Sequence, residues 1–186
     1  MLDFMLRRLL LSVGLFLLTA PLYLSQTNLE FDVKAAFLYN FAKFTEWPAR
    51  AFARSDSPFT FCLVGDPFGG GMEKAVQSET FNGRPVVVRR VSRGDDVLAC
   101  HILYVSEPES GKASEIIEMI AMAPVLTVGE TEDFIKSGGM IRFTENGQRV
   151  RFEINPDAAE KASLHLSSKL LRLADIVRVQ QRGARR

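Results

Sequence analysis

The residue types that most often carry chemistry are sparse in this chain of 186 residues. Its two histidines, His101 and His165, have no Cys, His or carboxylate partner at metal-ligand spacing on their own predicted elements. His101 adjoins Cys100, but that sulfur could act as a thiolate nucleophile only if it were not in a disulfide. No nucleophile elbow of the type G-x-S-x-G occurs. The sequence therefore predicts no catalytic residue, no metal site and no cofactor.

A glycine-rich stretch at residues 65–71 lies between a predicted strand and a predicted helix, where a phosphate-binding loop would be. It lacks the Gly-Lys-Ser/Thr sequence, and its glycines do not follow the G-x-G-x-x-G spacing of dinucleotide sites. This favours a flexible turn between strand and helix. A small-ligand cleft at the carboxyl end of the sheet is the alternative.

An acidic cluster of Glu130, Glu132 and Asp133 could be taken for the carboxylate pair of a hydrolase. Thr131 can act as an N-cap, and acidic side chains in a first helical turn interact favourably with the helix dipole. The sequence therefore predicts a helix-capping role for this cluster.

The N-terminal residues have the pattern of a secretory signal peptide. Arg7 and Arg8 precede residues 9–20, an uncharged run of twelve residues with six leucines. We expect residues 1–25 to be a signal peptide that is cleaved. Extended to residue 24, the apolar run has sixteen residues, slightly short of the roughly 17 to 25 that span a bilayer, so an uncleaved anchor is the alternative.

The two cysteines, Cys62 and Cys100, have different meanings in an exported and in a cytosolic chain. In an oxidising compartment they can form a disulfide that closes a loop of roughly 40 residues, worth on the order of 3 to 4 kcal/mol. Two buried free thiols are the alternative. Charge is less informative, because 23 basic and 22 acidic residues give a net charge of +1. That balance argues against nucleic-acid binding.

The remaining chain predicts an α/β fold. Phenylalanines at spacings of three and four indicate a helix from Phe31 to Trp47, where Pro48 stops it. Strands are then predicted at residues 59–64, 86–91, 100–106 and 125–128, with helices at 72–77, 110–121 and 132–136 between them. This alternation predicts a mostly parallel sheet with helices packed on it.

The C-terminal part departs from that alternation. Asn146-Gly147 between residues 140–144 and 149–154 predicts an antiparallel hairpin. Pro156 then opens a predicted long final helix that carries the apolar residues Leu164, Leu170, Leu171, Leu173 and Ile176. Lys169 and Arg172 on that helix belong either to a solvated face or to a contact surface.

Five ordered strings carry a family resemblance: KAAFLYNFAKFTEWP at residues 34–48, FCLVGD at 61–66, GGMIRF at 138–143, VRFEIN at 150–155 and LSSKLLRLA at 166–174. With them the chain resembles the YfiR family of small periplasmic proteins, from about residue 33 to residue 177. The resemblance implies a three-layer α/β sandwich: a mixed, mostly parallel sheet with a C-terminal antiparallel hairpin and helices on both faces. One such domain is expected at residues 30–180, followed by a basic tail at 181–186.

The resemblance also implies a function without catalysis. YfiR-like proteins bind the periplasmic sensor part of an inner-membrane diguanylate cyclase and repress it, which lowers cyclic-di-GMP and biofilm formation. An outer-membrane OmpA-like lipoprotein can sequester them, and members can form homodimers. The alternative from another class is a periplasmic sensor for an anionic or aromatic metabolite.

Individual residues follow from the resemblance. Cys62 and Cys100 match one disulfide of known members, whereas the second cysteine pair is replaced here by Arg142 and Arg149. The predicted partner-binding residues are Phe44, Trp47, Lys169 and Arg172, because tryptophan and arginine often anchor interfaces. Core packing for Phe44 and plain surface for Lys169 are the alternatives.

Overall fold

The computed structural model describes residues 20–65, 67–92, 96–147 and 149–179. The predicted signal peptide falls on residues 1–19, which lie outside the described residues, and on the first turns of helix α2 (Ala20–Lys43). The predicted basic tail also lies outside them. None of the described helices is both long and apolar enough to cross a membrane.

The centre of the fold is an eight-stranded sheet with the order β10-β8-β7-β6-β5-β2-β4-β3. Its strands are β2 (Phe59–Val64), β3 (Thr80–Phe81), β4 (Arg84–Arg90), β5 (Ile102–Val105), β6 (Leu126–Gly129), β7 (Ile141–Asn146), β8 (Arg149–Ile154) and β10 (Asp175–Ile176). Only β7–β8 and β3–β4 are antiparallel neighbours. The predicted mixed, mostly parallel sheet with a C-terminal hairpin is therefore confirmed.

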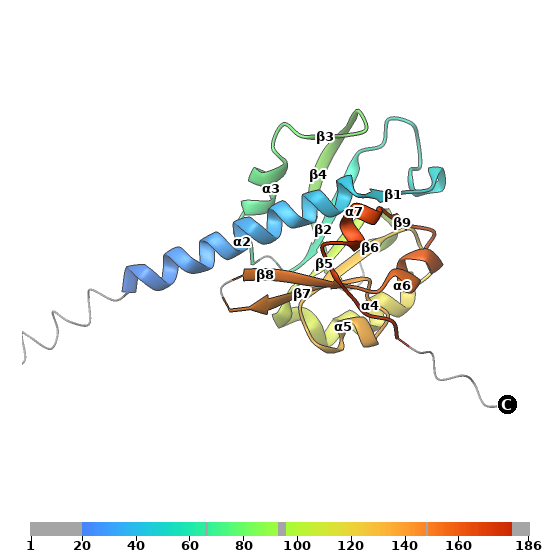
Figure 1. Ribbon diagram of the computed structural model, residues 1–186. Helices are drawn as coiled ribbons and strands as arrows, with labels where there is room; N and C mark the ends of the chain where they lie inside the picture. The colour runs from blue at the N-terminus through green and yellow to red at the C-terminus, as the bar shows by residue number, and fades with distance from the viewer. Residues whose placement is uncertain (1–19, 66, 93–95, 148, 180–186) are drawn as a thin grey trace, which may run out of the picture.

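Helices cover both faces of this sheet, as Figure 1 shows. On one face lie α2, α3 (Gly71–Val76), α6 (Pro156–Lys161) and α7 (Ser168–Leu171), whereas α4 (Ala113–Ile120) and α5 (Asp133–Lys136) lie on the other. Three short 3-10 helices occupy connections at Ala49–Ala51, Val97–Ala99 and Glu107–Lys112. The predicted three-layer sandwich is confirmed.

Each face of the sheet has its own apolar core. Under α2, the ring of Phe41 contacts Phe143 and Phe152 of the hairpin at centroid distances of 5.7 and 5.0 Å. On the opposite face, Ile116 and Ile117 of α4 pack in a second buried cluster. The buried strands β2, β5 and β6 are almost entirely apolar because a parallel sheet between two helix layers has no face left for water.

The predicted first helix is wrong at both ends. It begins earlier, at Ala20, and it ends at Lys43 rather than at Trp47. The C-terminal difference has a tertiary cause, because Thr45 and Glu46 form strand β1 (Thr45–Glu46), which pairs with β9 (His165–Leu166). Sequence periodicity cannot show such a long-range pairing.

The predicted long final helix is also wrong, because the chain forms α6, β9, α7 and β10 in its place. Ser163 has a φ of 60°, a left-handed conformation that ends α6. The Ser167 side chain then caps α7 by accepting from the Leu170 N–H. Finally, Asp175 and Ile176 leave the helical path and add strand β10 beside β8.

Candidate functional site

The predicted contact residues come from two segments that the structure places side by side. The Ser167 N–H donates to the Phe44 carbonyl at 2.9 Å, and Thr45 pairs with Leu166 in the β1–β9 ladder. This short ladder joins the end of α2 to the start of α7. It therefore places Phe44 and Trp47 on a segment that adjoins the one carrying Lys169 and Arg172.

The two aromatic residues are more enclosed than an exposed anchor would be. Phe44 and Trp47 are half-buried and pack against the main core. The Trp47 ring meets Phe59 and Phe81 edge-to-face, with centroid distances of 5.0 and 5.6 Å. Its Nε1 is buried without a hydrogen-bond partner among the described residues. Trp47 thus packs at the edge of the main core, and only part of its ring is exposed to solvent.

The basic residues, by contrast, lie on an open surface. Lys169 and Arg172 are exposed, and two apolar side chains beyond them are also exposed: Leu173 by 62% and Ile176 by 46%. We call Lys169, Arg172, Leu173 and Ile176 the α7–β10 surface. The sequence reasoning missed Leu173 and Ile176 by placing them inside a continuous helix. Ser167 as an N-cap was the signal that could have revealed the break.

A buried polar cluster joins α2 to the carboxyl ends of two central strands. Glu130, directly after β6, accepts hydrogen bonds from Lys34 Nζ at 2.8 Å and from the Tyr104 hydroxyl at 2.5 Å. Lys34 also forms an ion pair with Glu30 at 2.5 Å. The predicted capping role is therefore wrong for Glu130, and the N-cap of α5 is Glu132, without a side-chain cap bond.

The protonation states in this cluster suit a structural role. Burial alone would lower the pKa of Lys34, but hydrogen bonds to Glu130 and Glu30 outweigh it and raise that pKa. Burial and the charge of Glu130 raise the pKa of Tyr104, so its hydroxyl stays protonated and donates. A charged lysine, a carboxylate and a neutral phenol together hold α2 on the sheet.

Replacing Glu130 with glutamine keeps the shape of the cluster and removes one charge. We expect Glu130→Gln to lower the free energy of unfolding by about 2 kcal/mol, less than the ~3 to 5 kcal/mol of a fully broken buried pair, because Glu30 remains. The double variant Lys34→Met/Glu130→Gln should recover most of that loss. Urea unfolding of the native protein, of the two single variants and of the double variant measures this coupling. If the losses of the two single variants simply add in the double variant, Lys34 and Glu130 are not coupled.

The glycine-rich stretch forms a turn, as predicted, rather than an open cleft. Gly65 and Gly70 have φ values of 73° and 87°, which favour glycine. Between them, buried Phe68 packs on Phe31 of α2 and on Tyr104 of β5, at centroid distances of 6.2 and 5.0 Å. These rings fill the space above the strand ends, so the structure gives no support to the small-ligand alternative there.

The cysteines form the predicted disulfide between Cys62 of β2 and Cys100, whose Cα atoms are 5.8 Å apart. Cys100 is therefore not a thiolate partner for His101. That histidine is buried between the rings of Phe52 and Phe59, at centroid distances of 4.5 and 4.7 Å. Among the described residues, no three or more His, Cys, Asp or Glu side chains cluster where they could hold a metal ion.

The hairpin is held together by charge where the resemblance places a second cysteine pair in relatives. Arg142 lies opposite Glu153 and forms a part-buried ion pair with it at 2.9 Å. Arg149 lies opposite Asn146 and is exposed. A redox switch at these two positions is therefore absent from this chain, and the Arg142–Glu153 pair cross-links the two strands instead.

Comparison with protein-family models matches residues 31–175 to the family described as YfiR/HmsC-like. The matched region contains α2 from Phe31 onward, every strand through β9 and the α7 segment. The family consists of periplasmic regulators in cyclic-di-GMP signalling rather than of enzymes. Because this match covers well over half of the sequence, the chain belongs to the YfiR/HmsC-like family.

Proposed function

We propose that this protein binds the periplasmic sensor part of an inner-membrane diguanylate cyclase and represses it, thereby lowering cyclic-di-GMP and biofilm formation. The observation that carries the proposal is the α7–β10 surface, where exposed Leu173 and Ile176 lie beside Lys169 and Arg172. Large apolar side chains exposed next to arginine are a common composition of protein interfaces. Family membership supports the class of partner.

Repression then follows from differential affinity. A cyclase that exchanges between active and inactive arrangements is shifted toward whichever one the repressor binds more tightly. An apolar segment of the sensor part, exposed in the inactive arrangement, would bury Leu173 and Ile176. Acidic groups beside that segment would pair with Lys169 and Arg172. Phe44 and Trp47 would contribute the border of the contact from the adjoining β1 segment.

The proposal includes export and release. We propose that residues 1–25 are removed and that the mature chain acts in the periplasm. An OmpA-like lipoprotein of the outer membrane would relieve repression by competing for the α7–β10 surface. A homodimer through this surface would compete in the same way, so the fraction of the repressor that is free to bind the cyclase should fall as the total repressor concentration rises.

Binding of the mature protein to the purified periplasmic domain of the cyclase tests this function. We expect a Kd in the micromolar range or tighter, weakened at least tenfold by Leu173→Ala and by Arg172→Ala, with Trp47→Ala affecting stability as well as binding. Met119→Ala is the matched control, because Met119 is 71% exposed on the opposite helix layer. No binding by the native protein, or equal weakening by the control, would reject the proposed surface.

A further inference from the structure

The end of the sheet opposite β10 has an incomplete edge. Strand β3 pairs with β4 at two positions only, Thr80 with Pro85 and Phe81 with Arg84. On its other side β4 pairs with β2 along residues 86–90. The outer edge of residues 86–90 thus has no neighbouring strand among the described residues. An edge of this kind presents unpaired backbone donors and acceptors.

The backbone geometry shows which groups of β4 point away from β2. The Val91 N–H donates to the Leu63 carbonyl of β2, so Val91 faces β2. Successive residues of a strand direct their backbone groups to alternate sides, and therefore Val87 and Arg89 also face β2. The N–H and C=O groups of Val86 and Val88 face the open edge. Two residues at this spacing can pair with an added strand of about four residues.

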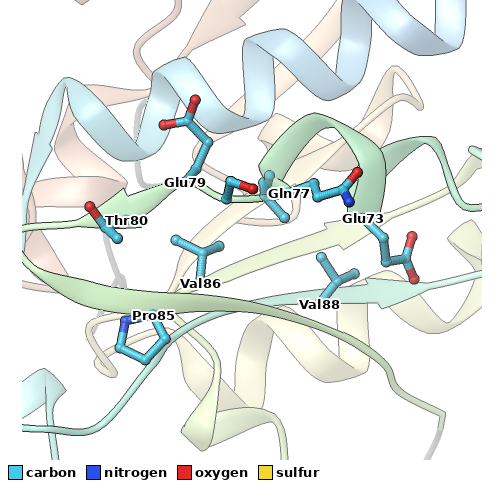
Figure 2. A pocket seen from close by; sticks show the side chains of 9 residues that line it. Glu73, Gln77, Glu79, Thr80, Pro85, Val86 and Val88 are labelled. Carbon is cyan, nitrogen blue, oxygen red and sulfur yellow. The ribbon is translucent and has the colours of Figure 1, made fainter.

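A cavity of about 340 Å³ lies beside this open edge. Val86 and Val88 point from β4 toward α3 and line the cavity, whereas Pro85 points to the other side of the strand (Figure 2). Val76 of α3 adds a further apolar side chain to its lining. A strand added to β4 would direct every second side chain into this cavity, where apolar groups would contact the three valines.

The acidic groups of the cavity are already engaged within the chain. Glu73 forms an ion pair with Arg90, and Glu79 accepts a hydrogen bond from the Tyr39 hydroxyl of α2. Arg89, on the opposite face of β4, is exposed and forms no ion pair with the described residues. The positive charge of Arg89 is therefore available to an acidic side chain of an added strand.

A second copy of this chain fits the edge poorly. Antiparallel self-pairing centred on Val88 or earlier would place Val91 or a preceding residue of the copy opposite Pro85, where Thr80 already lies. Antiparallel self-pairing centred on Arg89 or Arg90 places that arginine opposite the same arginine of the copy. Parallel self-pairing in register places both arginines opposite their counterparts. Like charges directly opposite each other destabilise a strand pair.

We infer that the open edge of β4 binds an extended segment of a partner polypeptide in which apolar residues alternate with acidic ones. The apolar side chains enter the cavity beside Val86 and Val88, and the acidic side chains face Arg89. Backbone hydrogen bonds to Val86 and Val88 provide affinity, and alternation provides specificity. This edge is separate from the α7–β10 surface, because β10 and β4 belong to opposite ends of the strand order.

Blocked synthetic peptides test the inference on the folded protein. The probe is acetyl-Thr-Val-Glu-Val-Glu-Val-Thr-amide, and its binding is followed by calorimetry and by amide hydrogen exchange of β4. We expect saturable binding with protection of the Val86 and Val88 amides. The same peptide with lysine in place of glutamate should bind at least tenfold more weakly. A third peptide, methylated on its alternate backbone nitrogens, keeps every side chain and should lose binding.

Two variants locate the site on the protein. Val88→Pro removes an outward-facing donor and leaves the β2 ladder intact, so it should abolish binding with little change in Tm. Arg89→Glu should reverse the preference toward the lysine peptide. Absence of binding by the glutamate peptide, binding that survives backbone methylation, or an unchanged preference in Arg89→Glu would each overturn the inference. The methylated peptide tests the native protein, so the result stands even if Val88→Pro fails to fold.

Discussion

Replacing both Cys62 and Cys100 with alanine is expected to lower the free energy of unfolding by about 4 kcal/mol. The bond links residues 38 positions apart, and the loss of loop-closure entropy in the unfolded chain accounts for a stabilisation of this size. Both cysteines are buried, so alanine is preferable to serine, which would bury a hydroxyl without a partner. Domains are typically stable by about 5 to 15 kcal/mol, and the loss is a large share of that.

Urea unfolding with and without a reductant measures this effect. Reductant should destabilise the native protein by nearly the amount that the double substitution does, and it should leave the double variant unchanged. An unfolding midpoint of the native protein that does not change on complete reduction would contradict the stabilising role expected of the disulfide. The segment between the cysteines contains α3, β3 and β4. Peptide binding at the β4 edge should therefore weaken on reduction before the whole domain unfolds.

The three layers could be predicted because each central strand and helix carries its own local signal. Apolar runs bounded by Pro and Gly mark β2 and β6, and the alternation of strands with helices implies a parallel sheet. The C-terminal segment could not be predicted in the same way. Its leucines satisfy helical spacing, but the pairing of β1 with β9 and of β10 with β8 outweighs that preference. Those pairings join residues more than a hundred positions apart in the first case and about twenty in the second.

The candidate site shows the same division. Lys169 and Arg172 could be found from the sequence, because charged residues among leucines stand out in any helical pattern. Leu173 and Ile176 could not, since an apolar residue at helical spacing is expected to be buried and only the break after α7 exposes it. Glu130 was misread for a related reason. Its partners Lys34 and Tyr104 come from distant elements, so its neighbours in sequence suggested a local role that it does not have.

Lowering the pH is expected to destabilise this protein through His101. The Thr60 N–H donates to Nδ1 of the ring at 3.1 Å, so Nδ1 must carry a lone pair and the ring must be neutral. Burial, opposed by the Ala51 backbone and reinforced by the positive charge of Arg84, lowers the pKa of His101 from 6.5 to about 4. A protonated ring would set a second donor against the Thr60 N–H, between the rings of Phe52 and Phe59.

The sign of the pH effect follows from this lowered pKa. Above pH 6.5 the histidine is neutral in both the folded and the unfolded chain, and its full contribution to stability is present. Between pH 6.5 and about 4 only the unfolded chain binds the proton, so stability falls as the pH falls. At about 1.4 kcal/mol for each pKa unit, the loss approaches about 3 kcal/mol at the acidic end.

The substitution His101→Asn isolates this contribution from that of the carboxylates, because asparagine keeps an acceptor for the Thr60 N–H and does not titrate. Native protein should be the more stable at pH 7, and its advantage should shrink by about 3 kcal/mol as the pH approaches 4. His165→Asn is the matched control, since His165 is exposed on β9. A stability difference between native protein and His101→Asn that stays constant with pH would contradict this expectation. It would mean that protonation of His101 does not lower the free energy of unfolding. Because the ring stacks on Phe59 of β2 and adjoins Cys100, acid should loosen this corner of the sheet while the disulfide still holds its strands together.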